Sequence, residues 1–203
     1  RFSIVIEIEP DFARGWAGRG SARLLKGDYA EAIEDFETAI SLKPDLAEAY
    51  ASRGAARLAI GDLDRAMNDA RISMSLEPDD PNSYIVMARA YQAEDDYVSA
   101  QAAFDTAVLL APDEGAPYFW RGRFLGQAGQ YSFGLSDLEK AIELSPSLSS
   151  AYLELGVLIA RSGGDLGEAR AMVEEALERA EDPKNQVVLD QAEQVLEEMD
   201  QLI

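Results

Sequence analysis

The sequence contains no histidine and no cysteine among its 203 residues. Their absence excludes catalysis by histidine, nucleophiles of the Ser-His or Cys-His type, disulfides and zinc sites built from the usual ligands. Carboxylate chemistry and the binding of hard metal ions are left open. The sequence also lacks an apolar run of the roughly 20 residues that cross a bilayer, so we expect no membrane insertion.

Basic residues are scarce: 18 Lys and Arg stand against 38 Asp and Glu, which gives a formal net charge of -20. Such a charge repels a nucleic-acid backbone, so we expect no nucleic-acid partner. The 47% of hydrophobic residues is typical of a folded globular chain. We interpret the acidic runs as solvated helix faces, and we expect no metal site because no calcium-loop spacing occurs.

The sequence begins with RFSIVIEIEP, which includes no initiator Met. It has neither the apolar core nor the cleavage site of a signal peptide. We therefore expect a piece of a longer protein. Its compartment is left open, with the cytoplasm as the default because no export signal is visible.

A fixed period of 34 residues runs through the chain. It is marked by Pro10, Pro44, Pro78, Pro112 and Pro146. Six residues after each proline stands an aromatic: Trp16, Tyr50, Tyr84, Tyr118 and Tyr152. Ten residues after each stands a small residue: Gly20, Gly54, Ala88, Gly122 and Gly156. Such a period indicates a stack of similar structural units, each of which packs against its neighbours.

Each unit contains two stretches of helical periodicity with a turn signal between them. The signals are Gly27-Asp28, Gly61-Asp62, Asp95-Asp96, Gly129-Gln130 and Gly163-Gly164-Asp165. Glycine tolerates the left-handed conformation that ends a helix, and the Asp after it can cap the next helix. We expect the first helices to be capped by Asp11, Asp45, Asp79, Asp113 and Ser147. No alternating strand pattern competes with the helices.

These columns resemble the tetratricopeptide repeat, whose pattern is W-x2-L-G-x2-Y followed by Ala, Phe, Ala and Pro. The resemblance covers residues 10–182. It implies an all-α fold, a right-handed superhelical solenoid of antiparallel helix pairs. Members of the family usually bind peptides or partner proteins on the concave face and are not themselves catalytic. We therefore expect a non-catalytic protein-interaction scaffold that uses no cofactor.

The resemblance also predicts how the chain is divided. The five repeats span about 11–44, 45–78, 79–112, 113–146 and 147–182. Residues 1–9 are expected to be the second helix of a truncated leading repeat, because Phe2 and Val5 fall in its Phe and Ala columns. Residues 183–203 are expected to form a capping helix, or alternatively a dimerisation helix. Its apolar face carries Val188, Ala192, Val195, Met199 and Leu202.

Five arginines stand where the family usually has Leu or Tyr: Arg19, Arg53 and Arg121 in the Leu column, and Arg23 and Arg57 in the Tyr column. An aspartate follows each of the first three by sixteen residues. Where the arginine is absent, the aspartate is absent too, as Met87 with Ala103 and Leu155 with Met172 show. An unpaired buried charge is costly. We therefore predict three structural ion pairs: Arg19–Asp35, Arg53–Asp69 and Arg121–Asp137.

The other face of each first helix lines the concave groove in the family. In this chain that face is small in repeats one and two, but apolar, aromatic and arginine-bearing in repeats three and four. Aromatic residues and arginine carry much of the energy of interfaces. We hypothesise a site for a peptide with an apolar anchor and a carboxylate, formed by Asn82, Ile85, Arg89, Phe119, Trp120 and Arg123. Alternatively, Phe119 and Trp120 pack against neighbouring repeats.

Other functions stay open. The chain lacks the full set of cations with which related chaperone-tail readers clamp two carboxylates, so that ligand is not expected. A self-assembly module would stack through Phe2, Val5 and Ile8 at one end and Leu202-Ile203 at the other, which makes a homo-oligomer an alternative. A targeting or regulatory segment of a larger multidomain enzyme is the third hypothesis.

Overall fold

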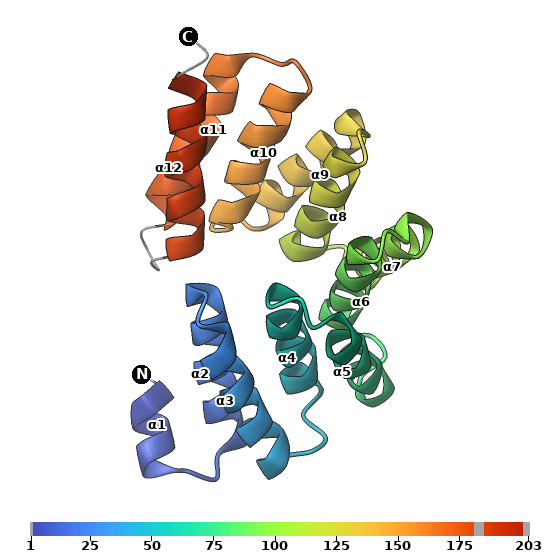
Figure 1. Cartoon of the computed structure of the whole chain (residues 1–203), viewed down its shortest axis with the longest axis vertical. Coiled ribbons are helices and arrows are strands. Elements are labelled where there is room, and N and C mark those ends of the chain that lie inside the picture. The colour runs from blue at the N-terminus through green and yellow to red at the C-terminus, as the bar shows by residue number, and fades with distance from the viewer. Residues whose placement is uncertain (1, 181–184, 201–203) are drawn as a thin grey trace. The chain divides into compact units, whose positions relative to one another are not determined.

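The structure is a computed structural model that describes residues 2–180 and 185–200, and within them it contains twelve α-helices and no strand (Figure 1). The first six are α1 (Phe2–Ile8), α2 (Ala13–Lys26), α3 (Tyr29–Leu42), α4 (Ala47–Ala59), α5 (Leu63–Leu76) and α6 (Pro81–Ala93). The others are α7 (Tyr97–Leu110), α8 (Gly115–Gln127), α9 (Tyr131–Leu144), α10 (Ser149–Arg161), α11 (Leu166–Ala180) and α12 (Gln186–Asp200). The chain is thus an all-α helical-repeat solenoid.

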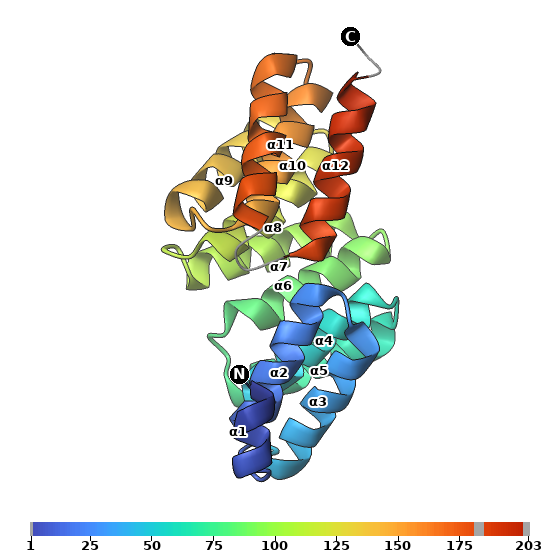
Figure 2. The ribbon, with the colours of Figure 1, turned by 90° about the vertical axis from the view of Figure 1, so that its left-hand side faces the viewer.

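Two compact units make up the chain: residues 1–110, called the N-terminal unit, and residues 111–203, called the C-terminal unit. In the N-terminal unit, α1 is followed by the pairs α2–α3, α4–α5 and α6–α7, each packed on the next (Figures 1 and 2). In the C-terminal unit, α8–α9 packs on α10–α11, and α12 packs on α10 and α11. The boundary falls between the third and fourth repeats, and no column of the repeat marks it.

The turns inside the repeats have the left-handed backbone that the sequence predicts. Gly27, Gly61, Gly129 and Gly163 have φ between 77° and 85°. The third repeat has Asp95 at this position with φ of 60°, and it is the one non-glycine residue with positive φ in the described part of the chain. Glycine adopts this backbone without the steric penalty that a Cβ brings. The prediction that these residues end the first helices is confirmed.

The predicted caps of the first helices are wrong. In repeat two, the N–H of Leu46 donates to the oxygen of Lys43 (3.2 Å) and that of Ala47 to the oxygen of Asp45 (3.1 Å). Asp45 therefore lies within a turn, one residue before the N-cap, and Leu46 takes the cap position with a buried side chain. The turn around the proline accompanies this shift, because in all five repeats the N–H of the cap residue donates to the oxygen of the residue before the proline. The same one-residue shift applies to Asp11, Asp79, Asp113 and Ser147.

Side chains cap only some of the helices. Asp80 accepts hydrogen bonds from the N–H groups of Asn82 and Ser83 at the start of α6. Before second helices, Asp96 accepts from the N–H of Ser99 (3.1 Å) and Asp165 from that of Glu168 (2.8 Å). Asp28 and Asp62 stand at the N-cap position of α3 and α5 without such a bond. The Gly-Asp signal thus locates the start of the second helix. It does not predict whether the Asp side chain forms a capping hydrogen bond.

The core of each unit follows the repeat columns. In the N-terminal unit, Phe36 and Phe104 are fully buried, and Phe36 belongs to a cluster made mostly of buried alanines. In the C-terminal unit, Leu138 and Val173 are fully buried, and Val188 of α12 joins the same cluster. α12 therefore covers apolar surface of the fifth repeat, as a capping helix would. Residues 183 and 201–203, including Leu202, lie outside the described residues.

Candidate functional site

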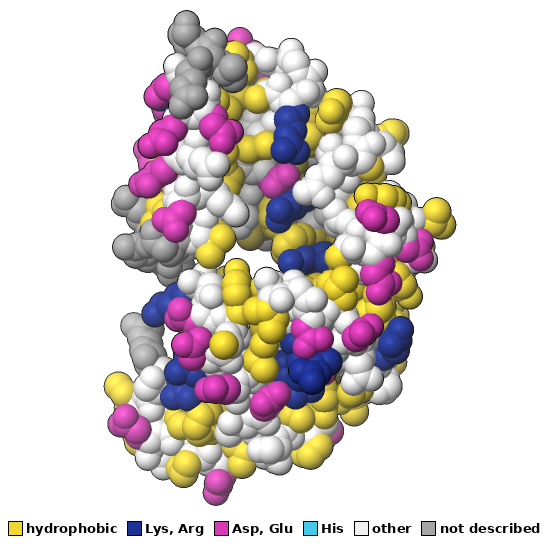
Figure 3. Space-filling model, in the orientation of Figure 1, with side chains coloured by type: hydrophobic (Ala, Val, Ile, Leu, Met, Phe, Trp, Pro, Cys, Tyr) yellow, Lys and Arg dark blue, Asp and Glu magenta, His cyan; other side chains and the backbone are white. Residues whose placement is uncertain are grey.

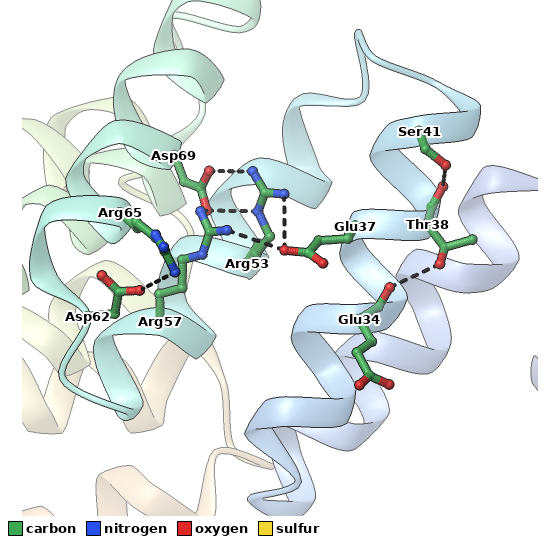
Figure 4. A network of polar contacts seen from close by, with 9 residues as sticks. All are labelled: Glu34, Glu37, Thr38, Ser41, Arg53, Arg57, Asp62, Arg65 and Asp69. Atoms are coloured by element: carbon green, nitrogen blue, oxygen red, sulfur yellow. Dashed lines mark hydrogen bonds and ion pairs between the residues drawn. The ribbon is translucent and has the colours of Figure 1, made fainter.

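The arginine–aspartate pairs lie between the two helices of a repeat (Figure 4). In repeat two, Arg53 Nε donates to Asp69 Oδ2 (3.0 Å) and its Nη2 to Oδ1 (2.7 Å), and Asp69 is fully buried. This two-point geometry is the strong form of an arginine–carboxylate contact. The structure brings together the other two predicted pairs in the same fork, with distances of 2.6–2.9 Å: Arg19 with Asp35, and Arg121 with Asp137.

A second arginine shares the aspartate in repeats one and two, which the sequence analysis missed. Arg57 Nη1 donates to Asp69 Oδ2 at 2.7 Å, and Arg23 Nη1 lies 2.7 Å from Asp35 Oδ2. Figure 4 shows Arg57 and Arg53 also directed at Glu37 of the preceding repeat, at 3.5 and 4.0 Å. The spacing of twelve residues from each second arginine to its aspartate was the available signal.

These charged groups are engaged in packing. The guanidinium of Arg53 lies 5.5 Å from the ring centroid of Tyr50, and that of Arg19 lies 4.7 Å from Trp16. The hydrogen bond with Asp35 raises the pKa of Arg19. The aspartate of each set is thus paired with arginine of its own repeat, and in repeat two the arginines also approach Glu37 of the repeat before. We assign the pairs to structure.

Three of the six predicted site residues lie on α6 in the N-terminal unit. Asn82 is exposed, and its side-chain amide donates to Asp80 Oδ1 at 3.0 Å. Ile85 is buried, with 5% of its surface exposed, and Arg89 is half-buried. The expectation that Ile85 is accessible to a ligand is therefore wrong. At the position of Ile85, the side chain is covered by its neighbours.

The other three lie on α8 in the C-terminal unit. Phe119 is 6% exposed and belongs to the apolar cluster of that unit, so the expectation that its ring is accessible is wrong as well. Trp120 is half-buried and meets Phe119 edge-to-face, with 4.9 Å between the ring centroids. The side chain of Arg123 is 40% exposed, and its guanidinium lies 5.7 Å from the centroid of Trp120. Trp120 and Arg123 are the accessible part of this set.

Glu154 on α10 faces the same surface, and the sequence analysis did not single it out. Its Oε2 lies 3.5 Å from Arg123 Nε, and its side chain is 20% exposed. Burial raises the pKa of Glu154, although the charges of Arg123 and Arg161 act to lower it. Glu154 stands in the same repeat column as Trp120, 34 residues later, which was the only signal in the sequence. We call Trp120, Arg123, Glu154 and Arg161 the α8–α10 surface.

Neither a metal site nor a membrane span is found in the described residues. Within residues 2–180 and 185–200, no three or more Asp, Glu, Cys or His residues are grouped so that they could hold a metal ion. In the same part of the chain, no helix has the length and apolar character needed to cross a bilayer.

A family model described as "TPR repeat" matches residues 20–61, which include most of α2, all of α3 and α4, and the turn after α4. Stacked antiparallel helix pairs with the same period make up the rest of both units. Residues 20–61 thus match the tetratricopeptide repeat, and the described helices have the fold of that family. Its fold is that of a protein-interaction scaffold. Among curated protein sequences, none matches this chain.

Solved structures of tetratricopeptide-repeat proteins resemble the chain. A thermophilic TPR protein of Thermus thermophilus is 22% identical with a TM-score of 0.76, covering 91% of this chain and 98% of that one. A chain of the APC/C hetero-tetramer Cut9–Hcn1 is 19% identical with a TM-score of 0.70, covering 95% of this chain but only 38% of its own. YrrB, described as a TPR protein with an unusual peptide-binding site, is 17% identical with a TM-score of 0.52, covering 93% and 96%. At such low identities, the structural likeness shows a shared fold alone.

Proposed function

We propose that the chain is a non-catalytic scaffold that binds a peptide or partner-protein segment on the groove face of its first helices. The observation that carries this proposal is the α8–α10 surface, where the ring of Trp120 and the partly exposed guanidinium of Arg123 lie side by side. Aromatic and arginine side chains are the residues that dominate interface energies. The peptide-binding site named for YrrB, and the complex named for Cut9–Hcn1, support the same class of function.

Within this proposal, the six predicted residues have different roles. Trp120 and Arg123 would contact the ligand in the C-terminal unit, while the buried ring of Phe119 packs edge-to-face against Trp120. Asn82 and Arg89 lie on α6 of the N-terminal unit and are not part of the α8–α10 surface. Buried Ile85 supports α6 and takes no direct part. The ligand would be a segment with an apolar anchor for Trp120 and a carboxylate for Arg123.

Self-assembly is a second candidate, because α1 exposes apolar side chains. Ile4 is 61% exposed and Ile8 is 74% exposed, although the helix has only seven residues. Exposed apolar patches mark contact surfaces. Leu202 and Ile203, the other part of that hypothesis, lie outside the described residues. Light scattering across a concentration series tests it: a mass that stays at one chain contradicts self-assembly.

Peptide-display selection on the purified chain tests the groove function. A double variant, Trp120→Ala with Arg123→Glu, is run in parallel after circular dichroism has shown that its helices are kept. We expect peptides that are enriched on the parent and lost on this variant. The matched control is Phe133→Ala with Arg65→Glu, which makes the same two kinds of change at exposed positions of second helices.

Two results would contradict the groove function. Enrichment that survives the double variant would place recognition on another face. Loss of enrichment in the control variant as well would show that changed charge, rather than the α8–α10 surface, governs binding. If no peptide is enriched, attention moves to the apolar face of α1.

A further inference from the structure

We propose that Glu154 is an internal competitor for the ligand, holding in the free protein the place beside Arg123 and Arg161 that an acidic residue of the bound segment takes over. The inference rests on the proposed function, because it concerns the same surface. Glu154 would then determine specificity, because it weakens the binding of acidic segments and sets which of them bind.

The contact between Arg123 and Glu154 is weak enough for a ligand carboxylate to replace Glu154. Arg123 Nε and Glu154 Oε2 lie 3.5 Å apart. By contrast, Arg53 holds Asp69 with two hydrogen bonds of 3.0 and 2.7 Å between fully buried and nearly buried groups. Long ion pairs at partly exposed sites contribute little to stability, whereas forked pairs contribute more. A carboxylate with better geometry can therefore displace Glu154 from Arg123.

The charge balance of the surface favours an acidic ligand. Arg123 and Arg161 both act on the Glu154 carboxylate, so two positive charges surround one negative charge. Figure 3 shows a magenta side chain between dark blue ones over α8 and α10. This local excess of one positive charge lies in a chain whose net charge is -20. A basic segment would meet two arginines, whereas an acidic segment would find a site complementary to its charge.

Burial makes Glu154 a poor stabilising group in its own right. Burial raises its pKa despite the two arginines, so its charged form is less well solvated in the folded chain than in water. Other repeats have no acid at this position: the column reads Gly18, Ser52, Val86 and Trp120. The repeat pattern thus does not require a carboxylate at position 154. Because Glu154 contacts Arg123 next to Trp120, it fits a role in recognition.

The ligand class follows from these contacts. The guanidinium of Arg123 lies close to both the ring of Trp120 and the Glu154 carboxylate. A segment with an apolar side chain next to an Asp or Glu would place the apolar group on Trp120 and the carboxylate on Arg123. Glu154 would then turn to solvent, which its partial exposure allows.

The test is a display selection from one peptide library on the parent, on Glu154→Gln and on Glu48→Gln in parallel. Glu48 is the matched control, because it is also an acidic residue on a first helix in a long contact with an arginine, 3.8 Å from Arg14. Both variants remove one negative charge from the chain. Glu154→Ser, which introduces the residue that repeat two has at this position, is a second variant for the case that the amide packs poorly.

We expect the peptides selected on Glu154→Gln to contain more Asp and Glu than those selected on the parent or on Glu48→Gln. An acidic peptide from the selection, once synthesised, should bind Glu154→Gln about tenfold more tightly than the parent, as expected when a competing charge is removed. Changing its acidic residue to Asn or Gln should abolish that gain. Titration calorimetry measures the affinities.

The outcomes separate this inference from the proposed function. Equal acidic content and equal affinity on the parent and Glu154→Gln, with binding still lost in Trp120→Ala with Arg123→Glu, would overturn the inference and leave the groove function standing. Weaker binding to both Glu154 variants would mean that Glu154 positions Arg123, which also overturns it. If no peptide is enriched on any variant, the proposed function fails and the inference fails with it.

Discussion

Repeats two and five fill the same three positions between their helices in opposite ways. Repeat two has Arg53 and Arg57 on α4 around a fully buried Asp69 on α5. Repeat five has Leu155, Ile159 and Met172 at the equivalent positions, and the first two are buried in the core of the C-terminal unit. Repeat two thus pairs charges at these positions, whereas repeat five packs apolar side chains there. The fold therefore requires that the set is complete, and not that it is charged.

The two repeats also differ in how closely their helices approach. A Cβ on Gly54 would lie 3.0 Å from a methyl group of Val86 and 3.3 Å from the oxygen of Ala66. A Cβ on Gly156, the same column in repeat five, would lie 2.6 Å from the oxygen of Ala169 and 2.7 Å from Val173. The apolar repeat is thus the tighter one at this crossing. Arginine side chains lie between the helices of repeat two, where repeat five has shorter apolar ones.

The largest effect is expected from breaking the charged set. Asp69→Asn leaves the guanidinium groups of Arg53 and Arg57 without a charged partner between the helices, so the free energy of unfolding should fall by about 3–5 kcal/mol. Urea denaturation followed by circular dichroism measures it. Asp137→Asn is the matched control: Leu125 stands where repeat two has its second arginine, so the loss should be smaller. Equal losses would show that the second arginine adds nothing.

Replacing all three charged residues of repeat two by the apolar residues of repeat five tests whether the fold needs the charges. The triple variant Arg53→Leu, Arg57→Ile and Asp69→Met copies repeat five into repeat two. Because complete apolar replacements of buried ion networks are often neutral or stabilising by about 1–4 kcal/mol, we expect stability to be kept or raised. Glu37 loses two partners, but its side chain is mostly hydrated. A loss comparable to that of Asp69→Asn would mean that repeat two needs its charges.

The smallest effect concerns the helix crossing. Gly156→Ala should lower the free energy of unfolding by about 1–3 kcal/mol, because the new methyl group meets a backbone oxygen that cannot easily move. Gly54→Ala should be close to neutral, because its neighbours are farther away and alanine favours the helix by about 1 kcal/mol. Thermal unfolding of the two variants compares them directly. A larger loss at Gly54 would reverse the order of tightness described above.

Much of the fold could be predicted from the period alone. The proline, aromatic and small-residue columns locate the helix pairs, and Gly27 and Gly61 mark the turns because few other residues accept a positive φ. The co-occurrence of Arg53 with Asp69 predicts a contact between helices. The helix starts could not be predicted to the residue, because the turn around each proline places the N-cap one residue after the expected position, as Leu46 after Asp45 shows.

The candidate site was less predictable, for a physical reason. Helical periodicity gives the direction of Phe119 around its own helix, but not the distance to the next helix, and that distance decides whether the ring is covered. The pair Arg123–Glu154 joins first helices of different repeats, so it depends on how α8 and α10 are spaced. The second arginines, Arg23 and Arg57, show the same limit: their aspartate was recognised, but its capacity for two partners was not.

The open left-handed turns have a consequence for engineering this chain. Around Gly61, Gly129 and Gly163, an added Cβ would have no atom within 4 Å, so these hairpin tips touch nothing else. Repeat five already carries one extra glycine, Gly164, at its tip and keeps both of its helices. Exposed tips of this kind accept insertions and new chain ends best. Fluorophores, affinity tags or circularly permuted termini placed there would report on the protein while leaving its helix faces intact.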